Sequence, residues 1–309
     1  MIKIKFENLL VSIVVSVVVF FNTISTTMLD RTFFQVKVNF LFIVVLLLGL
    51  RFLYKMRVSY KYLILSILLL LSGGLVYFQT NRLNFLVYSM LLVLLVNVDM
   101  KVVLRNYVVV AGILVVGVFL LSLIGMIPNL QYNRAGVIRN SFGFIYPTDF
   151  ASHCFYLFLA ISYLLKDKFI WTRSLFGVLL SAFIIKYCDA RLNALSILLA
   201  TVIFIYFYYS KEKKLKIFAL FPYSAVIFAS IVTYLSYKFS WSNPFLVSVN
   251  KLITGRLALG RNAFDTFGVH LFGTRNVQFI GSGGKTESVI GYNYVDSSYV
   301  QMLFTYGIV

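Results

Sequence analysis

The segment "YVVVAGILVVGVFLLSLIGMI", residues 107–127, decides the fold class. It holds 21 residues and contains no charged side chain. An α-helix rises about 1.5 Å per residue, so about 20 apolar residues cross the hydrocarbon core of a bilayer, which is about 30 Å thick. The segment is long enough to do so, and we predict a transmembrane helix here.

Similar apolar runs recur along most of the chain of 309 residues. The predicted spans are residues 9–28, 38–54, 62–78, 83–98, 107–127, 150–165, 169–187, 192–210 and 217–236. The mean hydropathy is +0.90 and only 12% of the residues are charged, against about 25% in soluble domains. These features predict an all-α, polytopic integral membrane protein with about nine or ten transmembrane helices.

Both ends of the chain have alternative interpretations. Lys3 and Lys5 precede an apolar run, as in a signal peptide, but the run is long and no small-residue cleavage site follows it, so we predict a retained first helix. A further apolar segment, 299–309, reaches only about 16 Å before the chain ends, and we therefore expect a truncated C-terminus. The predicted organisation is a bundle over 1–236, a long loop over 237–298 and the start of a further helix.

The charged residues between the spans predict an orientation. The short loops on one side carry 15 lysines and arginines, and those on the other side carry 7. The positive-inside rule places the richer side, and with it the N-terminus, in the cytoplasm. The loop over 237–298 is then outside the cytoplasm, and its aromatic residues indicate an ordered segment with a short helix near 257–272 lying on the membrane surface.

The net charge of +18 does not indicate nucleic-acid binding, because the basic residues are distributed between the apolar runs, as membrane topology requires. Two cysteines, Cys154 and Cys188, have no neighbour at ligand spacing, which argues against a zinc site and a disulfide framework. The stretch "GSGGKTES" at 281–288 has Phe279 where a phosphate-binding loop needs glycine, so we interpret it as a flexible turn.

Arginines in the predicted outer loops require an explanation other than topology. Among them are Arg134 and Arg139, then Arg191 in a tight loop, then Arg256 and Arg261 in the long loop. The guanidinium group offers a rigid fork of donors that matches phosphate or carboxylate, so a ring of these arginines around one cavity would suit a diphosphate. The alternative is salt bridging to Asp149, Asp189 and Asp265.

Other polar residues in the outer segments are weaker indications. His270 is one of two histidines, and a lone histidine in a loop is more often structural than catalytic. His153 lies near the start of a predicted span, where a polar side chain usually faces the bundle interior. Asp296, Ser297 and Ser298 precede an apolar segment, and their oxygens are expected to cap its helix.

Several stretches together resemble a known family. They are an outer loop with arginine followed by "SFGFIYP" (141–147), "DAR" (189–191) before a span, "TGR…A…F…HLFG" (254–273) and "YNYVDSSYVQMLFTYGI" (292–308). In this order they resemble the Wzy-type oligosaccharide repeat-unit polymerases, of the O-antigen polymerase and ligase superfamily. The pattern departs at 146–149, where relatives often carry a His-Pro-Asn-like stretch, and at Ala190, where they carry serine.

The resemblance implies a membrane-embedded glycosyltransferase at the outer face of the bacterial plasma membrane. Such an enzyme takes polyprenyl-diphosphate-linked oligosaccharides, delivered by a flippase, and joins them into capsular, exo- or O-antigen polysaccharide without a metal or other cofactor. Flippase and chain-length-regulator proteins are the implied partners. The resemblance assigns Arg139, Arg191, Arg256 and Arg261 to the diphosphate, and His270, Asp265, Glu287 and Asp296 are candidates for general acid–base help.

Two alternatives stay open from the sequence. A ligase of the same superfamily would transfer finished glycan to another acceptor, and the loops do not separate it from a polymerase. A polysaccharide or lipid transporter would be expected to show internal repeats and interrupted helices. The chain shows no repeat, and Gly73-Gly74 is the one candidate break.

Overall fold

The computed structural model describes residues 2–29, 60–96, 98–134, 136–166, 168–210, 221–253, 255–281, 291, 293–295 and 297–308. It is mostly helical. The chain forms two compact units, one from Met1–Lys55 and Leu94–Lys213 and the other from Met56–Val93 and Lys214–Val309. We call them unit 1 and unit 2 and describe each by itself.

Five of the described helices are long and apolar enough to cross a membrane: α4 (Tyr60–Thr80), α6 (Met100–Leu123), α7 (Pro147–Leu165), α8 (Ile170–Cys188) and α9 (Arg191–Tyr209). Each coincides with a predicted span. α1 (Ile2–Ile24) and α5 (Leu83–Leu95) contain shorter apolar segments. The chain is therefore an all-α polytopic membrane protein, as predicted. α11 (Phe221–Lys238) matches the span at 217–236, and the span at 38–54 lies outside the described residues.

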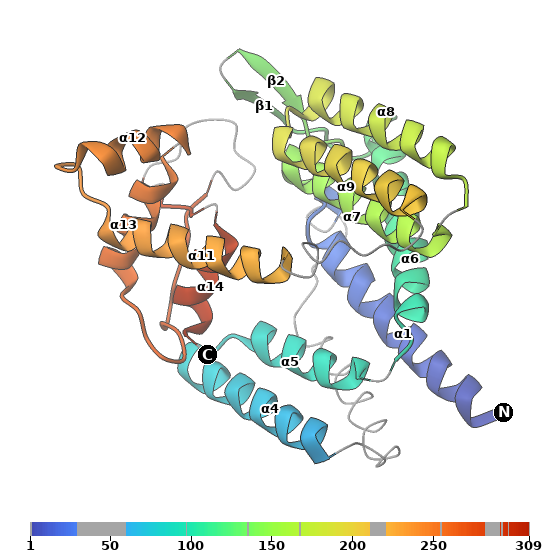
Figure 1. The fold of residues 1–309 in the computed structure, drawn as a ribbon, viewed down its shortest axis with the longest axis horizontal. Coiled ribbons are helices and arrows are strands. Elements are labelled where there is room, and N and C mark those ends of the chain that lie inside the picture. Colours follow the sequence, from blue (N-terminus) through green and yellow to red (C-terminus); the bar gives the residue numbers. More distant parts are fainter. Residues whose placement is uncertain are drawn as a thin grey trace. The chain divides into compact units, whose positions relative to one another are not determined.

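Unit 1 packs α1, α6, α7, α8 and α9 with a short hairpin of β1 (Gln131–Arg134) and β2 (Val137–Asn140) (Figure 1). Small side chains lie where these helices meet. A side chain at Gly177 of α8 would place its Cβ 2.5 Å from Thr201 Oγ1 and 2.8 Å from the Phe158 ring, whereas Leu175 and Leu199 of the same helices are exposed. Small residues inside and large apolar residues outside are the packing expected of helices in lipid.

A buried arginine, Arg173, links two helices at one end of unit 1. The side chain of Arg173, in the first turn of α8, is buried. It donates to the carbonyl oxygens of Ser162 and Lys166 at the end of α7, at 3.0 and 2.6 Å. The last carbonyls of a helix have no intrahelical donor, so Arg173 satisfies two of them and ties α8 to α7.

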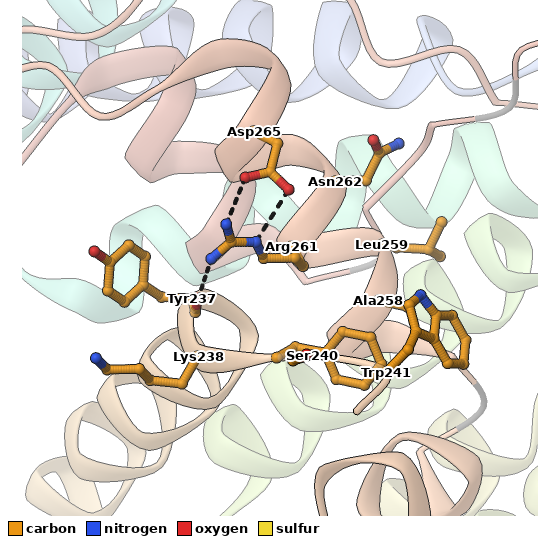
Figure 2. A pocket seen from close by; sticks show the side chains of 10 residues that line it. Tyr237, Lys238, Ser240, Trp241, Ala258, Leu259, Arg261, Asn262 and Asp265 are labelled. Carbon is orange, nitrogen blue, oxygen red and sulfur yellow. Dashed lines mark hydrogen bonds and ion pairs between the residues drawn. The ribbon is translucent and has the colours of Figure 1, made fainter. Parts of the chain in front are cut away.

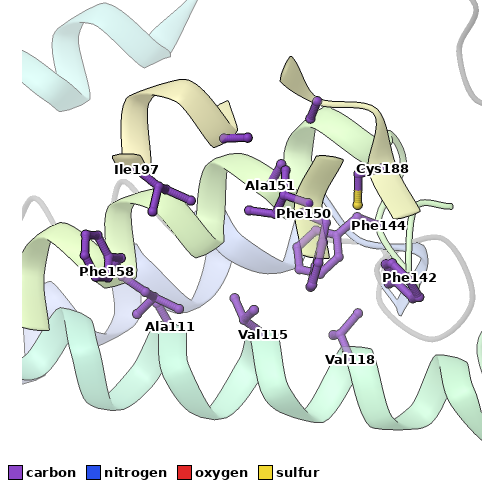
Figure 3. Close-up of a cluster of buried hydrophobic side chains, with 14 of the residues drawn as sticks. Ala111, Val115, Val118, Phe142, Phe144, Phe150, Ala151, Phe158, Cys188 and Ile197 are labelled. Carbon is purple, nitrogen blue, oxygen red and sulfur yellow. The ribbon is translucent and has the colours of Figure 1, made fainter. Parts of the chain in front are cut away.

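The other end of unit 1 contains an aromatic core. Phe142, Phe144 and Phe150 pack with Val118 and Ile184 (Figure 3). The stretch "SFGF" makes a turn here in which Phe142 and Gly143 both have positive φ, and a Cβ at Gly143 would meet Val118 at 2.8 Å. This motif of the family resemblance thus has a packing role, because it fixes the start of α7 against α6.

Unit 2 packs α4, α5 and α11 with the helices of the late segment: α12 (Pro244–Leu252), α13 (Arg256–Phe267) and α14 (Ser298–Tyr306). The described part of the late segment forms helices, and α13 overlaps the short helix predicted near 257–272. α11 and α13 approach closely at Gly260, where a Cβ would lie 2.7 Å from Ser236. The late segment therefore shares its core with a helix that precedes residue 237.

Two motifs of the family resemblance meet in unit 2. Ile308 N–H donates to the Leu271 carbonyl at 3.1 Å, and Thr274 N–H donates to the Phe304 carbonyl at 2.8 Å. Gly273 and Gly307 both have positive φ, and a Cβ at either would approach the other segment's backbone closely. The glycines of "HLFG" and "YGI" thus permit a backbone-to-backbone contact.

Candidate functional site

Three of the predicted outer arginines gather in unit 1 with one carboxylate. β1 and β2 pair so that Tyr132 faces Arg139, and Arg139 Nε donates to the Cys188 carbonyl at 2.9 Å. Beside it, Asn140 Nδ2 donates to the Tyr187 carbonyl at 3.3 Å. The hairpin is thereby held against the loop between α8 and α9. We call Arg134, Arg139, Asp189 and Arg191 the basic cluster.

The charges of the basic cluster act on one another. Arg139 is half-buried, and its burial lowers the pKa of its guanidinium. The positive charges of Arg134 and Arg191 lower this pKa further, while Asp189 raises it. The charges of Arg134, Asp189 and Arg191 therefore all act on Arg139, and a bound anion would relieve the repulsion between the arginines.

Asp189 is the acid of this cluster, and sequence reasoning considered it only as a salt-bridge partner. It has a left-handed backbone conformation with φ of 45° at the end of α8. Its Oδ1 accepts from Arg191 Nε at 2.8 Å, so the expected pairing is confirmed. Its Oδ2 is buried and has no hydrogen-bond partner in the described part of the chain. The Arg191 side chain stays 77% exposed.

The neighbouring helix ends are fixed by polar contacts of their own. Asp149 caps α7 by accepting from Tyr146 N–H at 3.2 Å, so this carboxylate serves the helix and makes no described ion pair with an arginine. His153 Nε2 lies 2.9 Å from Thr26 Oγ1, which agrees with the expected inward orientation of this histidine. Asn193 of α9 donates to Ser152 Oγ of α7 at 2.8 Å.

The other two outer arginines lie on α13 in unit 2. Arg256 stands in the first turn and is exposed. Arg261 is engaged through three nitrogens (Figure 2): Nε and Nη2 hold Asp265 at 3.0 and 2.8 Å, and Nη1 donates to the Tyr237 carbonyl at 2.6 Å. Pairing with Asp265 is the alternative considered from the sequence, and the structure confirms it for Arg261. Three of its five N–H donors are therefore directed at protein atoms.

The candidate acid–base residues fall in different places. Asp265 is held in the ion pair with Arg261. His270 is exposed after the end of α13, and its imidazole makes no hydrogen bond within the described residues. Glu287 and Asp296 lie outside the described residues. Ser297 occupies the expected cap position of α14, but no side-chain capping bond forms, and its Oγ has no partner among the described residues.

The described residues contain no group of three or more histidine, cysteine or acidic side chains placed to hold a metal ion. The features of the described residues that suggest a function are therefore the arginine cluster, the pocket and individual acidic side chains. Comparison with family models, with curated proteins and with solved structures gives no match.

Proposed function

We propose that this chain is a membrane-embedded glycosyltransferase that polymerises polyprenyl-diphosphate-linked oligosaccharide repeat units at the outer face of a bacterial plasma membrane. The observation that carries the proposal is the basic cluster, in which three arginines stand together with one carboxylate at one end of a helical membrane unit. The family resemblance of the late segment supports the same activity. In this proposal the cluster receives the diphosphate of the donor lipid.

The chemistry needs such a cluster. The oxygen of an acceptor hydroxyl forms a bond to the anomeric carbon of the donor glycan while the bond from that carbon to the diphosphate breaks. The diphosphate leaves with the bonding electrons, and the acceptor hydroxyl loses its proton. Preorganised cations in a site of low dielectric constant stabilise the charge that develops on the leaving group. A donor with an α-linked diphosphate would give an inverted product by direct attack.

Within the basic cluster Arg139 is the principal diphosphate ligand of this proposal. Its Nε is taken by the Cys188 carbonyl, while its two Nη groups make no hydrogen bond within the described residues and can form a fork towards phosphate. Arg191 of the basic cluster is exposed and assists in the proposal. The assignment of Arg256 to the diphosphate stays a prediction from the family resemblance. The engaged donors of Arg261 assign it to holding the protein rather than to the diphosphate.

Proton removal from the acceptor is assigned to one of the candidate acid–base residues. Diphosphate is a good leaving group, so weak base assistance suffices. The carboxylate of Asp265 is occupied by its ion pair with Arg261. Of the candidates that the structure describes, His270 is exposed, and its imidazole makes no hydrogen bond with another described residue. The proposal therefore assigns proton removal to His270 first.

The glycan of a deletion strain tests this function. Lipid-linked intermediates are extracted and sized by mass spectrometry, and the strain is complemented with the wild-type gene, Arg139→Ala or Lys186→Ala. Lys186 is a matched exposed cation on the last turn of α8, near the cluster but directed over the Tyr187 ring. Accumulation of single repeat units in the deletion and Arg139→Ala strains, with wild-type glycan for Lys186→Ala, is expected. Long lipid-linked polymer would indicate a ligase, and unchanged glycan would refute the proposal.

A further inference from the structure

Unit 2 contains a pocket of about 830 Å³ between the end of α11 and one side of α13. Its polar and aromatic lining includes Tyr237, Ser240, Trp241, Arg261 and Asn262 (Figure 2). Its volume falls within the range of small-molecule sites, roughly 300–1,000 Å³. None of the functions assigned above uses this pocket.

The walls of the pocket are fixed by close contacts. The Gly260–Ser236 contact brings α13 against α11. Arg261 then ties the two helices together, because it holds Asp265 on its own helix and the Tyr237 carbonyl at the end of α11. The pocket is therefore preorganised, and a ligand would lose little free energy in ordering it.

Trp241 is the most exposed of the aromatic rings that line the pocket. Its side chain is 73% exposed, and it contacts the buried Phe239 ring at an interplanar angle of 79°. The Tyr237 ring, in contrast, has the Lys238 ammonium, the Arg261 guanidinium and the Phe264 ring around it. A large rigid ring held from one side and open on the other is suited to stacking.

The polar groups beside Trp241 suit a neutral polyol. The Asn262 side chain makes no hydrogen bond within the described residues and offers both donors and an acceptor. Asp265 retains free lone pairs beside its bonds to Arg261, and Ser240 supplies a hydroxyl. Arg261 directs three of its five N–H groups at protein atoms, and the ammonium of Lys238, the other cation of the lining, lies over the Tyr237 ring.

We propose that this pocket binds a neutral pyranose ring of the glycan, with the ring's C–H face stacked on Trp241 and its hydroxyls bonded to Asn262 and Asp265. The electron-rich indole face attracts the polarised C–H groups of a sugar. The inference rests on the proposed function for the identity of the glycan. Arg261 is a positioning residue of this subsite.

The two tryptophans of the chain make the subsite measurable. Trp171 is the other one, and it lies in unit 1 against Tyr209. In the Trp171→Phe variant all tryptophan fluorescence comes from Trp241. The probe is the free oligosaccharide that mild acid releases from the lipid intermediates of the deletion strain. A saturable change in fluorescence and protection from acrylamide quenching are expected.

Matched variants separate stacking from a structural effect. The reverse reporter, Trp241→Phe with Trp171 retained, should show no sugar-dependent change. Asn262→Ala in the Trp171→Phe background should raise the dissociation constant about 2- to 13-fold, since a net hydrogen bond contributes about 0.5–1.5 kcal/mol. Its side chain is exposed, so the variant should fold, and equal elution on size exclusion in detergent checks this.

Two results would overturn the subsite. One is the absence of any response of Trp241 to the oligosaccharide in the folded protein. The other is strong quenching of Trp241 by brominated lipids without a response to sugar, which would make it an anchor at the membrane interface. If the deletion strain accumulates single repeat units and Trp241 is silent, the subsite fails while the proposed function stands. If no repeat units accumulate, the function fails, and free glucose, galactose and N-acetylglucosamine serve as probes with the same two readouts.

Discussion

Replacing Arg139 by alanine should lower polymerase turnover more than replacing any other arginine of the basic cluster. Arg139 carries five N–H donors, and one of them, on Nε, is bonded to the Cys188 carbonyl. The Nη groups remain for the substrate. Because Arg139 is half-buried among two further cations, its charge acts on a bound diphosphate with less screening by water than an exposed arginine would experience.

The expected magnitude follows from this difference in exposure. Removing one preorganised donor from the site of a developing charge costs about 2.7–4 kcal/mol, or 10²- to 10³-fold in turnover. Arg191 is 77% exposed, and interactions of exposed charges contribute about 0.2–1 kcal/mol, so Arg191→Ala should lose less than about tenfold. Arg139→Lys keeps the positive charge but loses the paired Nη groups, so its loss of turnover should lie between those of Arg139→Ala and Arg191→Ala.

The assay is extension of purified lipid-linked repeat units by the protein in nanodiscs, followed by gel electrophoresis of the products. Asn140→Ala is the matched control, since Asn140 makes the neighbouring hydrogen bond from the hairpin to α8 but carries no charge. It should retain most of the wild-type rate. An equal loss in Asn140→Ala and Arg139→Ala would show that docking of the hairpin matters and not the guanidinium. A larger loss in Arg191→Ala than in Arg139→Ala would refute the reasoning from burial.

Three further predictions concern other parts of the chain. Arg256→Ala should lower polymer yield by less than about tenfold, because Arg256 is exposed, while membrane insertion stays normal; Lys213→Ala, in a predicted cytoplasmic loop, should leave polymer length unchanged on a glycan gel. Gly177→Ala should destabilise unit 1 by about 1–3 kcal/mol through overpacking, which lowers the melting temperature in detergent. The control Gly112→Ala, with nothing within 4 Å of the added Cβ, should leave the melting temperature unchanged. Equal melting temperatures for the two variants would contradict the close packing at Gly177. Arg173→Ala should lower the melting temperature too, because each charged hydrogen bond that it removes contributes about 1.5–3 kcal/mol; an unchanged value would make its two helix-capping bonds unimportant.

The positions of the helices were predictable because lipid imposes one rule on the whole sequence. A helix that crosses a bilayer must be long and apolar, so residues 107–127 and their counterparts stand out without knowledge of packing. What hydropathy does not encode is which helices share a core. α11 packs with α13, and that contact depends on the missing side chain of Gly260, a feature that apolar run lengths do not contain.

The candidate site was predictable in its residue types and less so in its arrangement. Arg139 and Arg191 were singled out because they oppose the topological charge bias, and their approach to each other requires the hairpin to fold onto the loop between α8 and α9. Asp189 was seen only as a neighbour of Arg191, since neither its burial nor its unpartnered oxygen follows from the letters "DAR". The sequence does not indicate a binding role for Trp241, because one tryptophan after a span is ordinary in a membrane protein.

Arg261 illustrates why residue type alone cannot assign a ligand. From the sequence, Arg256 and Arg261 are equivalent members of one polar stretch. Arg261 lies four residues before Asp265 on α13, a spacing that places the two on the same helix face, and their bidentate pair leaves little for a substrate. The same ion pair and the bond to the Tyr237 carbonyl shape the wall of the neighbouring pocket. A loss of polymer in an Arg261 variant would therefore reflect a deformed sugar subsite, and it would be distinguished from a lost diphosphate contact by weaker binding of free oligosaccharide to Trp241.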